Sequence, residues 1–164
     1  LSLPKHKLHI VMKRISIVVL TGLALVLISC GGDGSKQKSP EAKLADSLYK
    51  DVMNGHDVGM AKMGRLTRAE QTTRRLLDSI KNLPAKAQQS AEPLRIKLDS
   101  LQKDLSYAEF AMNKWMEEFN IDSALNQLDQ RIEYLKSEKI KVSKVKESIL
   151  NGLEKADSVL RNKF

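Results

Sequence analysis

The sequence is poor in the residues that build β-sheet domains and disulfide frameworks. Its 164 residues include one Cys, four Pro and eight Gly, and aromatic residues make up 4%. A single Cys excludes an internal disulfide and a multi-Cys zinc site. The scarcity of Gly, Pro and aromatic residues argues against a sandwich, a barrel or a multi-strand sheet. The abundant Lys, Leu, Ser, Glu and Ala are instead typical of long helices, and the length suits one domain with or without a targeting segment.

The first 29 residues contain no acidic residue and four Lys or Arg. From Met12, a short cationic stretch precedes an apolar run over residues 15–28, and small or polar residues follow. This order predicts a secretory signal peptide that starts at Met12, with residues 1–11 as an upstream extension. The apolar run is shorter than the roughly 20 residues that a membrane span needs.

The only Cys closes this N-terminal segment. Leu27, Ile28, Ser29 and Cys30 resemble the bacterial lipobox, which is cleaved before a Cys that then carries acyl chains. We therefore expect palmitate-type lipidation of Cys30 and a membrane anchor through it, because several acyl chains give lasting attachment. The alternative is an ordinary signal peptide or one anchoring helix, with an incidental Cys. Residues 30–39 are rich in Gly, Ser and Lys, which predicts a flexible tether.

The lipobox resemblance implies a location in the bacterial cell envelope. Residues 31–34 lack an acidic run, so we favour the periplasmic side of a membrane over the cell surface. The net charge of +8 falls to 24 basic against 20 acidic residues once the segment before Cys30 is removed. This modest excess, in a compartment outside the cytoplasm, gives no reason to expect nucleic acid as a partner.

Three helices are expected after the tether, at about 40–82, 91–119 and 122–161. Ser39 followed by Pro40 is typical of a helix start, with Ser as N-cap and Pro in the first turn. The second segment has the most regular apolar spacing, alternating between four and three residues as in a coiled-coil seam. The seam comprises Leu94, Leu98, Leu101, Leu105, Ala108, Met112, Trp115 and Phe119.

The short turns predict how the helices face each other. If the first two segments fold back near residue 86, Met60 lies beside Asn113. Gly inside a helix is unfavourable by about 0.5–1 kcal/mol against Ala, so Gly55 and Gly59 indicate a packing requirement. We expect these two glycines to make room for the indole of Trp115, as a packing cluster.

The expected fold is all-α: an elongated antiparallel three-helix bundle with coiled-coil-like packing over residues 40–164. A signal peptide helix and the tether would precede it. Because the third helix should begin level with residue 54, residues 40–53 are expected to project as a helical stalk.

Three segments of the sequence resemble a family of small lipoproteins from Bacteroidetes-type bacteria. They are HDVGMAKMGRL (residues 56–66), SYAEFAMNKWMEEFN (residues 106–120) and EYLKSEKIKVSKVKESIL (residues 133–150). Some members are labelled "viral A-type inclusion protein". Gly59 and Ala61 depart from the usual pattern of the family. The resemblance implies an envelope lipoprotein with a helical fold, and it implies no established activity.

Thioether and imidazole side chains gather in the expected middle of the bundle. The candidate metal ligands are His56, Met60, Met63, Met112 and Met116. These groups suit soft Cu(I), which leads to the hypothesis of an envelope metal-binding protein. The alternative is ordinary core packing, because Met is an adaptable core residue and its spacing here is that of a seam.

Catalytic patterns are missing from the sequence. His56 and Asp57 are adjacent, so on a helix their side chains point about 100° apart and are not expected to share a site. Glu117 and Glu118 are also adjacent in sequence, so for the same reason we do not expect their carboxylates to form one site. No nucleophile–base pair or phosphate-binding loop is found, so we expect no enzymatic activity.

Basic residues are frequent on the first and third helices, which would suit an anionic surface or an acidic partner. Solvated helix faces with local ion pairs are the alternative. The residues are Lys62, Arg65, Arg68, Arg74, Arg75, Lys136, Lys139, Lys141, Lys144 and Lys146. We therefore expect a non-catalytic lipoprotein that contacts an envelope protein or self-associates, with Cu(I) binding as the alternative function.

Overall fold

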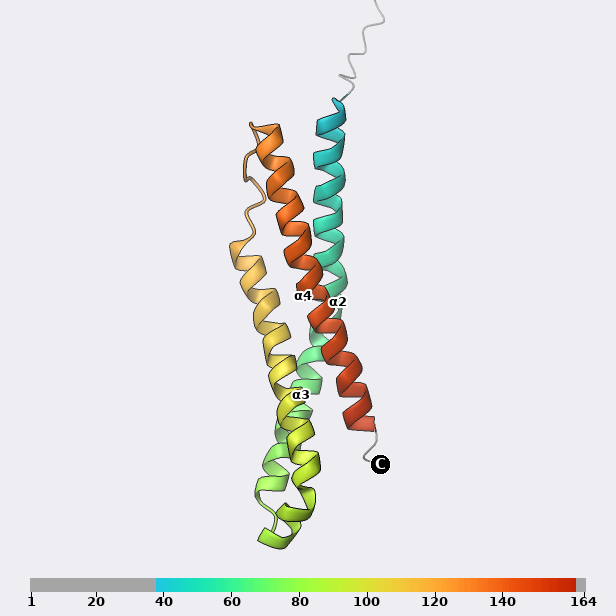
Figure 1. Cartoon of the computed structure of the whole chain (residues 1–164), viewed down its shortest axis with the longest axis vertical. Coiled ribbons are helices and arrows are strands. Elements are labelled where there is room, and N and C mark those ends of the chain that lie inside the picture. The colour runs from blue at the N-terminus through green and yellow to red at the C-terminus, as the bar shows by residue number, and fades with distance from the viewer. Residues whose placement is uncertain (1–37, 162–164) are drawn as a thin grey trace, which may run out of the picture. The chain divides into compact units, whose positions relative to one another are not determined.

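The computed structural model describes residues 38–161. They form three helices, α2 (Pro40–Lys81), α3 (Ala85–Glu118) and α4 (Leu128–Arg161), and contain no strand (Figure 1). The predicted all-α three-helix bundle is confirmed. Among these residues, no helix has both the length and the apolar character that crossing a membrane requires. The predicted signal peptide, lipobox and Cys30 lie outside the described residues.

Helix α2 begins where its N-terminal residues predict. The Ser39 side chain accepts a hydrogen bond of 3.1 Å from the Ala42 N–H, and Pro40 occupies the first turn. This bond satisfies one of the free N–H groups that every helix start presents. At the other end, the Gln88 amide donates to the Lys81 and Leu83 carbonyls, at 3.0 and 2.7 Å. The side chain of the next helix therefore closes the end of α2.

Helix α3 begins at Ala85, whereas the sequence pattern placed its start at residue 91. Pro93 lies inside the helix, eight residues after its start. Pro84 is the N-cap, and its carbonyl accepts bonds from the Ala87 and Gln88 N–H groups. The polar residues after Pro84 are helical, and the Gln88 side chain among them docks against the end of α2.

Helix α4 begins at Leu128 rather than at residue 122. Ala124 has a φ of 55°, which no right-handed helix contains, so the preceding residues form turns instead. The Arg131 guanidinium donates to the Ile121 and Ser123 carbonyls, at 3.1 and 2.9 Å. The Tyr134 hydroxyl accepts from the Asn120 N–H at 2.8 Å. Two side chains of α4 thus hold the connecting segment in place.

The connecting segment carries the chain along the bundle, so α4 starts level with the beginning of α2 (Figure 1). Lys139 pairs with Asp51 at 2.7 Å, and Arg65 pairs with Asp157 at 2.5 Å. Both pairs join α2 to α4, which run in the same direction, and α3 runs opposite to both. The predicted stalk of residues 40–53 is wrong, because α4 packs along that part of α2.

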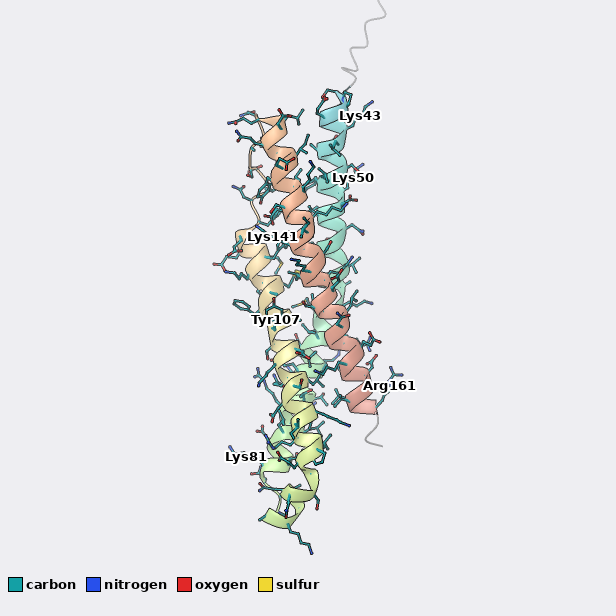
Figure 2. All side chains as sticks on the ribbon, viewed as in Figure 1. Lys43, Lys50, Lys81, Tyr107, Lys141 and Arg161 are labelled. Atoms are coloured by element: carbon teal, nitrogen blue, oxygen red, sulfur yellow. The ribbon has the colours of Figure 1, made fainter. Side chains whose placement is uncertain are left out.

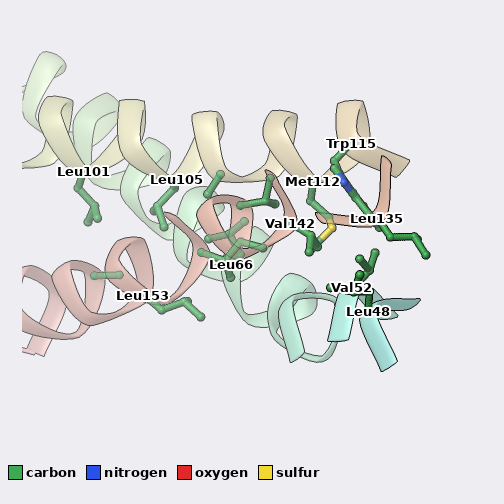
Figure 3. Close-up of a cluster of buried hydrophobic side chains, with 14 of the residues drawn as sticks. Leu48, Val52, Leu66, Leu101, Leu105, Met112, Trp115, Leu135, Val142 and Leu153 are labelled. Carbon is green, nitrogen blue, oxygen red and sulfur yellow. The ribbon is translucent and has the colours of Figure 1, made fainter. Parts of the chain in front are cut away.

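One hydrophobic core runs between the three helices (Figure 3). The predicted seam of α3 is confirmed, with its six central residues buried and Leu94 and Phe119 half-buried at the ends. The core residues on α2 and α4 are Ala45, Leu48, Val52, Leu66, Ile132, Leu135, Val142, Val145, Ile149, Leu153 and Ala156. Complete burial of a Leu or Val side chain contributes about 1.5–3 kcal/mol, so this seam is the main stabilising feature.

Candidate functional site

The His/Met cluster lies where α2 passes α3. The ring centroids of His56 and Trp115 are 5.7 Å apart, so the predicted register of the first two helices is confirmed. Trp115 stacks in turn on Phe119, at 4.8 Å between centroids, and Phe119 on Tyr134, at 6.1 Å. An aromatic row therefore extends from α2 across the end of α3 to α4.

The side chains of His56 and Asp57 contact each other, although the two residues are adjacent on a helix. The His56 Nδ1 lies 2.9 Å from an Asp57 Oδ1, although Asp57 is 71% exposed. The expectation that these neighbours would not share a site is therefore wrong, because the short Asp side chain reaches back to the ring. With the Nδ1 held by the carboxylate, the Nε2 is the ring atom available to accept or bind another group.

The candidate methionines occupy different environments. Met112 is completely buried and Met63 is half-buried, whereas Met60 and Met116 are 38% and 37% exposed. Met112 belongs to the hydrophobic core. In the described part of the chain, no three His, Cys, Asp or Glu side chains form a group that could hold a metal ion. Of the five predicted Cu(I) ligands, Met112 is closed off from solvent, His56 and Met63 are half-buried, and Met60 and Met116 are exposed.

The two glycines of the predicted packing cluster accommodate other neighbours than Trp115. A Cβ on Gly55 would lie 2.9 Å from the Val142 Cγ1, and one on Gly59 would be closer still to the Met112 Cε. Gly55 therefore allows α4 to approach, and Gly59 makes room for a methionine. The two glycines do meet a packing requirement, as predicted, but the side chains that need the space are Val142 and Met112 and not Trp115.

Trp115 has a polar partner that the sequence interpretation missed. Its indole Nε1 donates to the Glu138 Oε2 at 2.9 Å, and the other Glu138 oxygen accepts from the Lys141 ammonium at 2.8 Å. Glu138 is only 4% exposed. Its spacing from Leu135 and Val142 places Glu138 in the apolar seam of α4. An acid at such a position needs a buried hydrogen-bond partner, and this was the sequence signal that could have revealed the contact.

A second buried acid, Glu70, lies between α2 and α3. One of its oxygens accepts from the Ser106 hydroxyl at 2.6 Å and from the Gln102 amide and Arg74 guanidinium, each at 2.8 Å. Burial alone would raise the pKa of Glu70, but hydrogen bonds, first from Ser106 and then shared with Glu109, together with the charge of Arg74, lower it. The structure thus favours the ionised form of Glu70.

Glu109 lies beside Glu70 and responds in the opposite direction. Burial, and then the hydrogen bond and negative charge of Glu70, raise the pKa of Glu109. The Thr67 hydroxyl is 3.4 Å from a Glu109 oxygen. Two neighbouring carboxyl groups with pKa values displaced in opposite directions form one coupled pair. Sequence reasoning missed this pair because its members are on different helices.

Several of the predicted basic residues form ion pairs. Lys136 pairs with Glu133 at 2.7 Å. Lys139, which has no acid three or four residues away in sequence, pairs across helices with Asp51. Basic side chains occur along the whole length of the helices, as the labelled Lys43, Lys81 and Lys141 illustrate (Figure 2). This distribution is that of solvated helix faces more than of one compact anion site.

Two buried acids, Glu70 and Glu138, thus have hydrogen-bond partners on a neighbouring helix. Three side chains of α2 and α3 form a solvent-accessible group that we call the His/Met rim: His56, Met60 and Met116. No family model, curated protein or solved structure matches this chain.

Proposed function

We propose that the protein is a non-catalytic lipoprotein of the bacterial cell envelope, anchored through Cys30, whose helical bundle contacts a partner. The observation that carries this proposal is the order of its parts. Leu27-Ile28-Ser29-Cys30 ends an apolar segment, a Gly/Ser-rich stretch follows, and helix α2 begins at Pro40. Such an order would hold a folded module on a short tether beside a membrane.

Exposed hydrophobic side chains on α3 support a role in protein contact. Tyr107 and Phe110 are 61% and 60% exposed, and they lie one turn apart on the same side of the helix. Ile96 is 56% exposed. Aromatic residues are enriched in protein interfaces, where their large apolar surface is buried on binding.

Metabolic labelling tests the anchor. Cells that express the full chain are grown with an alkyne-bearing fatty acid, and the purified protein is examined for label. We expect label on the wild type, a mature chain that begins at Cys30, and no label on the Cys30→Ser variant. An unlabelled wild-type chain, or equal label on both, would refute the lipoprotein proposal.

Photocrosslinking in whole cells tests the partner. A photoreactive amino acid replaces Phe110, and in a matched control it replaces Gln71, an exposed polar residue of α2. We expect a specific adduct from position 110 and none from position 71. Recovery of the monomer alone from both positions would count against a partner on this part of α3.

A second candidate function is Cu(I) binding by the His/Met rim. The observation that favours it is the Asp57 contact to the His56 Nδ1, since metal-bound histidines usually have their other ring nitrogen held in this way. Titration of the full chain with Cu(I) under a competing chelator gives the test. Affinity that is the same for the wild type and a His56→Ala, Met60→Ala variant would exclude this function.

A further inference from the structure

Helices α2 and α3 extend beyond the end of α4. Lys155 of α4 lies beside Ser100 and Asp104 of α3, at 2.8 and 2.5 Å, and α4 ends at Arg161. At 1.5 Å per residue, Arg161 reaches about one and a half turns past Lys155. Figure 2 accordingly places Arg161 well short of Lys81, the last residue of α2. We call the remaining two-helix part, residues 72–97, the tip hairpin.

The apolar seam that α4 covers in the three-helix part continues into the tip hairpin. Gly55 and Gly59 of α2 face α4 side chains, and Leu105 of α3 lies near Gly152 of α4. Repeating these positions every seven residues predicts which tip residues face the same way. They are Leu76, Ile80, Leu83, Ala87, Ala91 and Leu94. Ile80 is buried, the other residues except Leu83 are half-buried, and Leu83 is 39% exposed. In the described part of the chain, no third helix covers this face.

Cations border this apolar face. Ser100 and Asp104 of α3 contact α4, and Lys86 and Lys97 occupy the equivalent positions of the seven-residue repeat in the tip hairpin. On α2, the Arg75 guanidinium turns toward Thr72 and lies 3.2 Å from its hydroxyl. Arg75, Lys86 and Lys97 are all exposed. None of the three forms an ion pair with another of the residues 38–161.

The acidic residues of the tip hairpin lie on its other side. Asp78 and Glu92 of the tip hairpin, with Asp99 just beyond it, line a hollow of about 580 Å³ between α2 and α3, together with Lys81 and Arg95. Arg95 pairs there with Glu92 at 2.6 Å and with Asp99 at 2.5 Å. The two faces therefore differ in charge. The charged residues that border the face in line with α4 are unpaired cations, whereas the opposite face combines its acids with Lys81 and Arg95.

We propose that the tip hairpin binds an acidic amphipathic helix of a partner protein, in line with α4. Its apolar residues would cover Leu76, Leu83 and Leu94, and its acidic flanks would pair with the bordering cations. One ion pair between α4 and α2 has this polarity, that of Asp157 with Arg65, while Lys139 of α4 pairs with Asp51 of α2 in the opposite sense. Binding of an amphipathic helix in an apolar groove is a recurring mode of recognition.

The charges and the position of the tip favour this occupant over two others. A second copy of the tip would bring cations against cations, which is unfavourable. A membrane surface would have to be reached at the far end of α2, whose 42 residues span about 63 Å from Pro40. This step rests on the proposed function, which places the lipid anchor before Pro40.

Two designed peptides test the proposal. Both are fluorescent 21-residue helices with Leu at alternating three- and four-residue spacing. One has Glu on both flanks and the other has Lys. The full chain in detergent micelles is titrated against each by anisotropy, with empty micelles as the blank. We expect the Glu peptide to bind about tenfold or more tightly than the Lys peptide, since three exposed ion pairs distinguish them.

Charge reversal gives the decisive comparison. The variant Arg75→Glu, Lys86→Glu, Lys97→Glu should prefer the Lys peptide by a similar factor. The control Lys62→Glu, Lys103→Glu, Lys144→Glu changes three other exposed cations that form no ion pair within residues 38–161, and it should keep the wild-type preference. All six changes are at exposed positions, and unchanged circular dichroism melts would verify folding. The proposal is overturned if neither peptide binds saturably, or if all three proteins share one preference.

Two further measurements address the other occupants. Binding to phosphatidylglycerol vesicles that the reversal abolishes, without competition from the Glu peptide, would replace the proposal with a membrane contact. A dimer in sedimentation that Leu83→Asp dissociates would replace it with self-association. Fatty-acid label on Cys30 together with no peptide binding overturns this inference alone. Peptide binding without label overturns the anchor and leaves the tip site intact.

Discussion

At the scale of single residues, the contact of Trp115 with Glu138 combines a core aromatic with a buried carboxylate. Replacing Trp115 by Phe removes the only indole donor and leaves one Glu138 oxygen without its partner. We expect the free energy of unfolding to fall by about 2–4 kcal/mol, from the lost charge-assisted hydrogen bond and the smaller ring. Urea unfolding followed by circular dichroism measures this change.

The matched control for this prediction is Glu138→Gln. Its amide oxygen can still accept from the indole, so the loss should be about 1 kcal/mol. A larger loss for Glu138→Gln than for Trp115→Phe would show that the ion pair with Lys141, and not the indole contact, is the important interaction.

Three helical glycines of α2 should respond differently to replacement by Ala. Gly64 has only the Arg68 guanidinium near its missing Cβ, at 3.8 Å, so Gly64→Ala should stabilise by about 0.5–1 kcal/mol. Gly55→Ala should destabilise by about 1–3 kcal/mol, because a β-branched Val142 cannot move aside. Gly59→Ala should fall between them, since the flexible Met112 methyl can shift. Thermal melts of the three variants would contradict this if their order were reversed.

At the scale of helix pairs, the carboxyl groups between α2 and α3 should give stability two opposite pH dependences. The lowered pKa of Glu70 means that its contribution is present above the ordinary value of 4.5 and is lost as pH falls through the folded-state pKa. The raised pKa of Glu109 means that its contribution is present at low pH and is lost as pH rises through the folded-state pKa.

Amide substitutions separate these two contributions. Glu70→Gln should lower the urea midpoint at pH 7 and have less effect at pH 4, because it removes an ionised acceptor. Glu109→Gln should raise the midpoint at pH 7 and change little at pH 4, because it resembles the protonated form. Midpoints measured from pH 4 to 7.5 test both, and shifts of the same sign at pH 7 would contradict the coupled pair.

The helices show what periodicity predicts and where it fails. The regular seam of α3 and the capping residues of α2 were recognisable, because heptad spacing and an N-terminal Ser-Pro are local features. The start of α4 was not, because Ala124 adopts a left-handed conformation that side chains of α4 stabilise from a distance. The buried acids Glu70 and Glu138 likewise depend on partners from another helix, so their roles required the packed structure.

At the scale of the whole helical unit, stability should vary along its length. The later part of α3 lies beside both α2 and α4, whereas the part of α3 nearest Ala85 extends with α2 beyond the end of α4 (Figure 1). We therefore expect amides of the tip hairpin to exchange with deuterium before those of the three-helix part, because fewer buried contacts oppose local opening. Exchange followed by mass spectrometry measures this difference. Uniform protection from residue 76 to residue 115 would show that the tip is covered in solution.

The parallel course of α2 and α4 has a mechanical consequence. A tensile load between Pro40 and the turn at Leu83 would run along the axis of α2, a single helix of 42 residues. Helix α4 lies alongside and would resist by shear, with its inter-helix pairs Lys139–Asp51 and Arg65–Asp157 loaded together. The tip hairpin, which lacks this reinforcement, would yield first. The three-helix part would thus resist stretching more strongly than the tip hairpin.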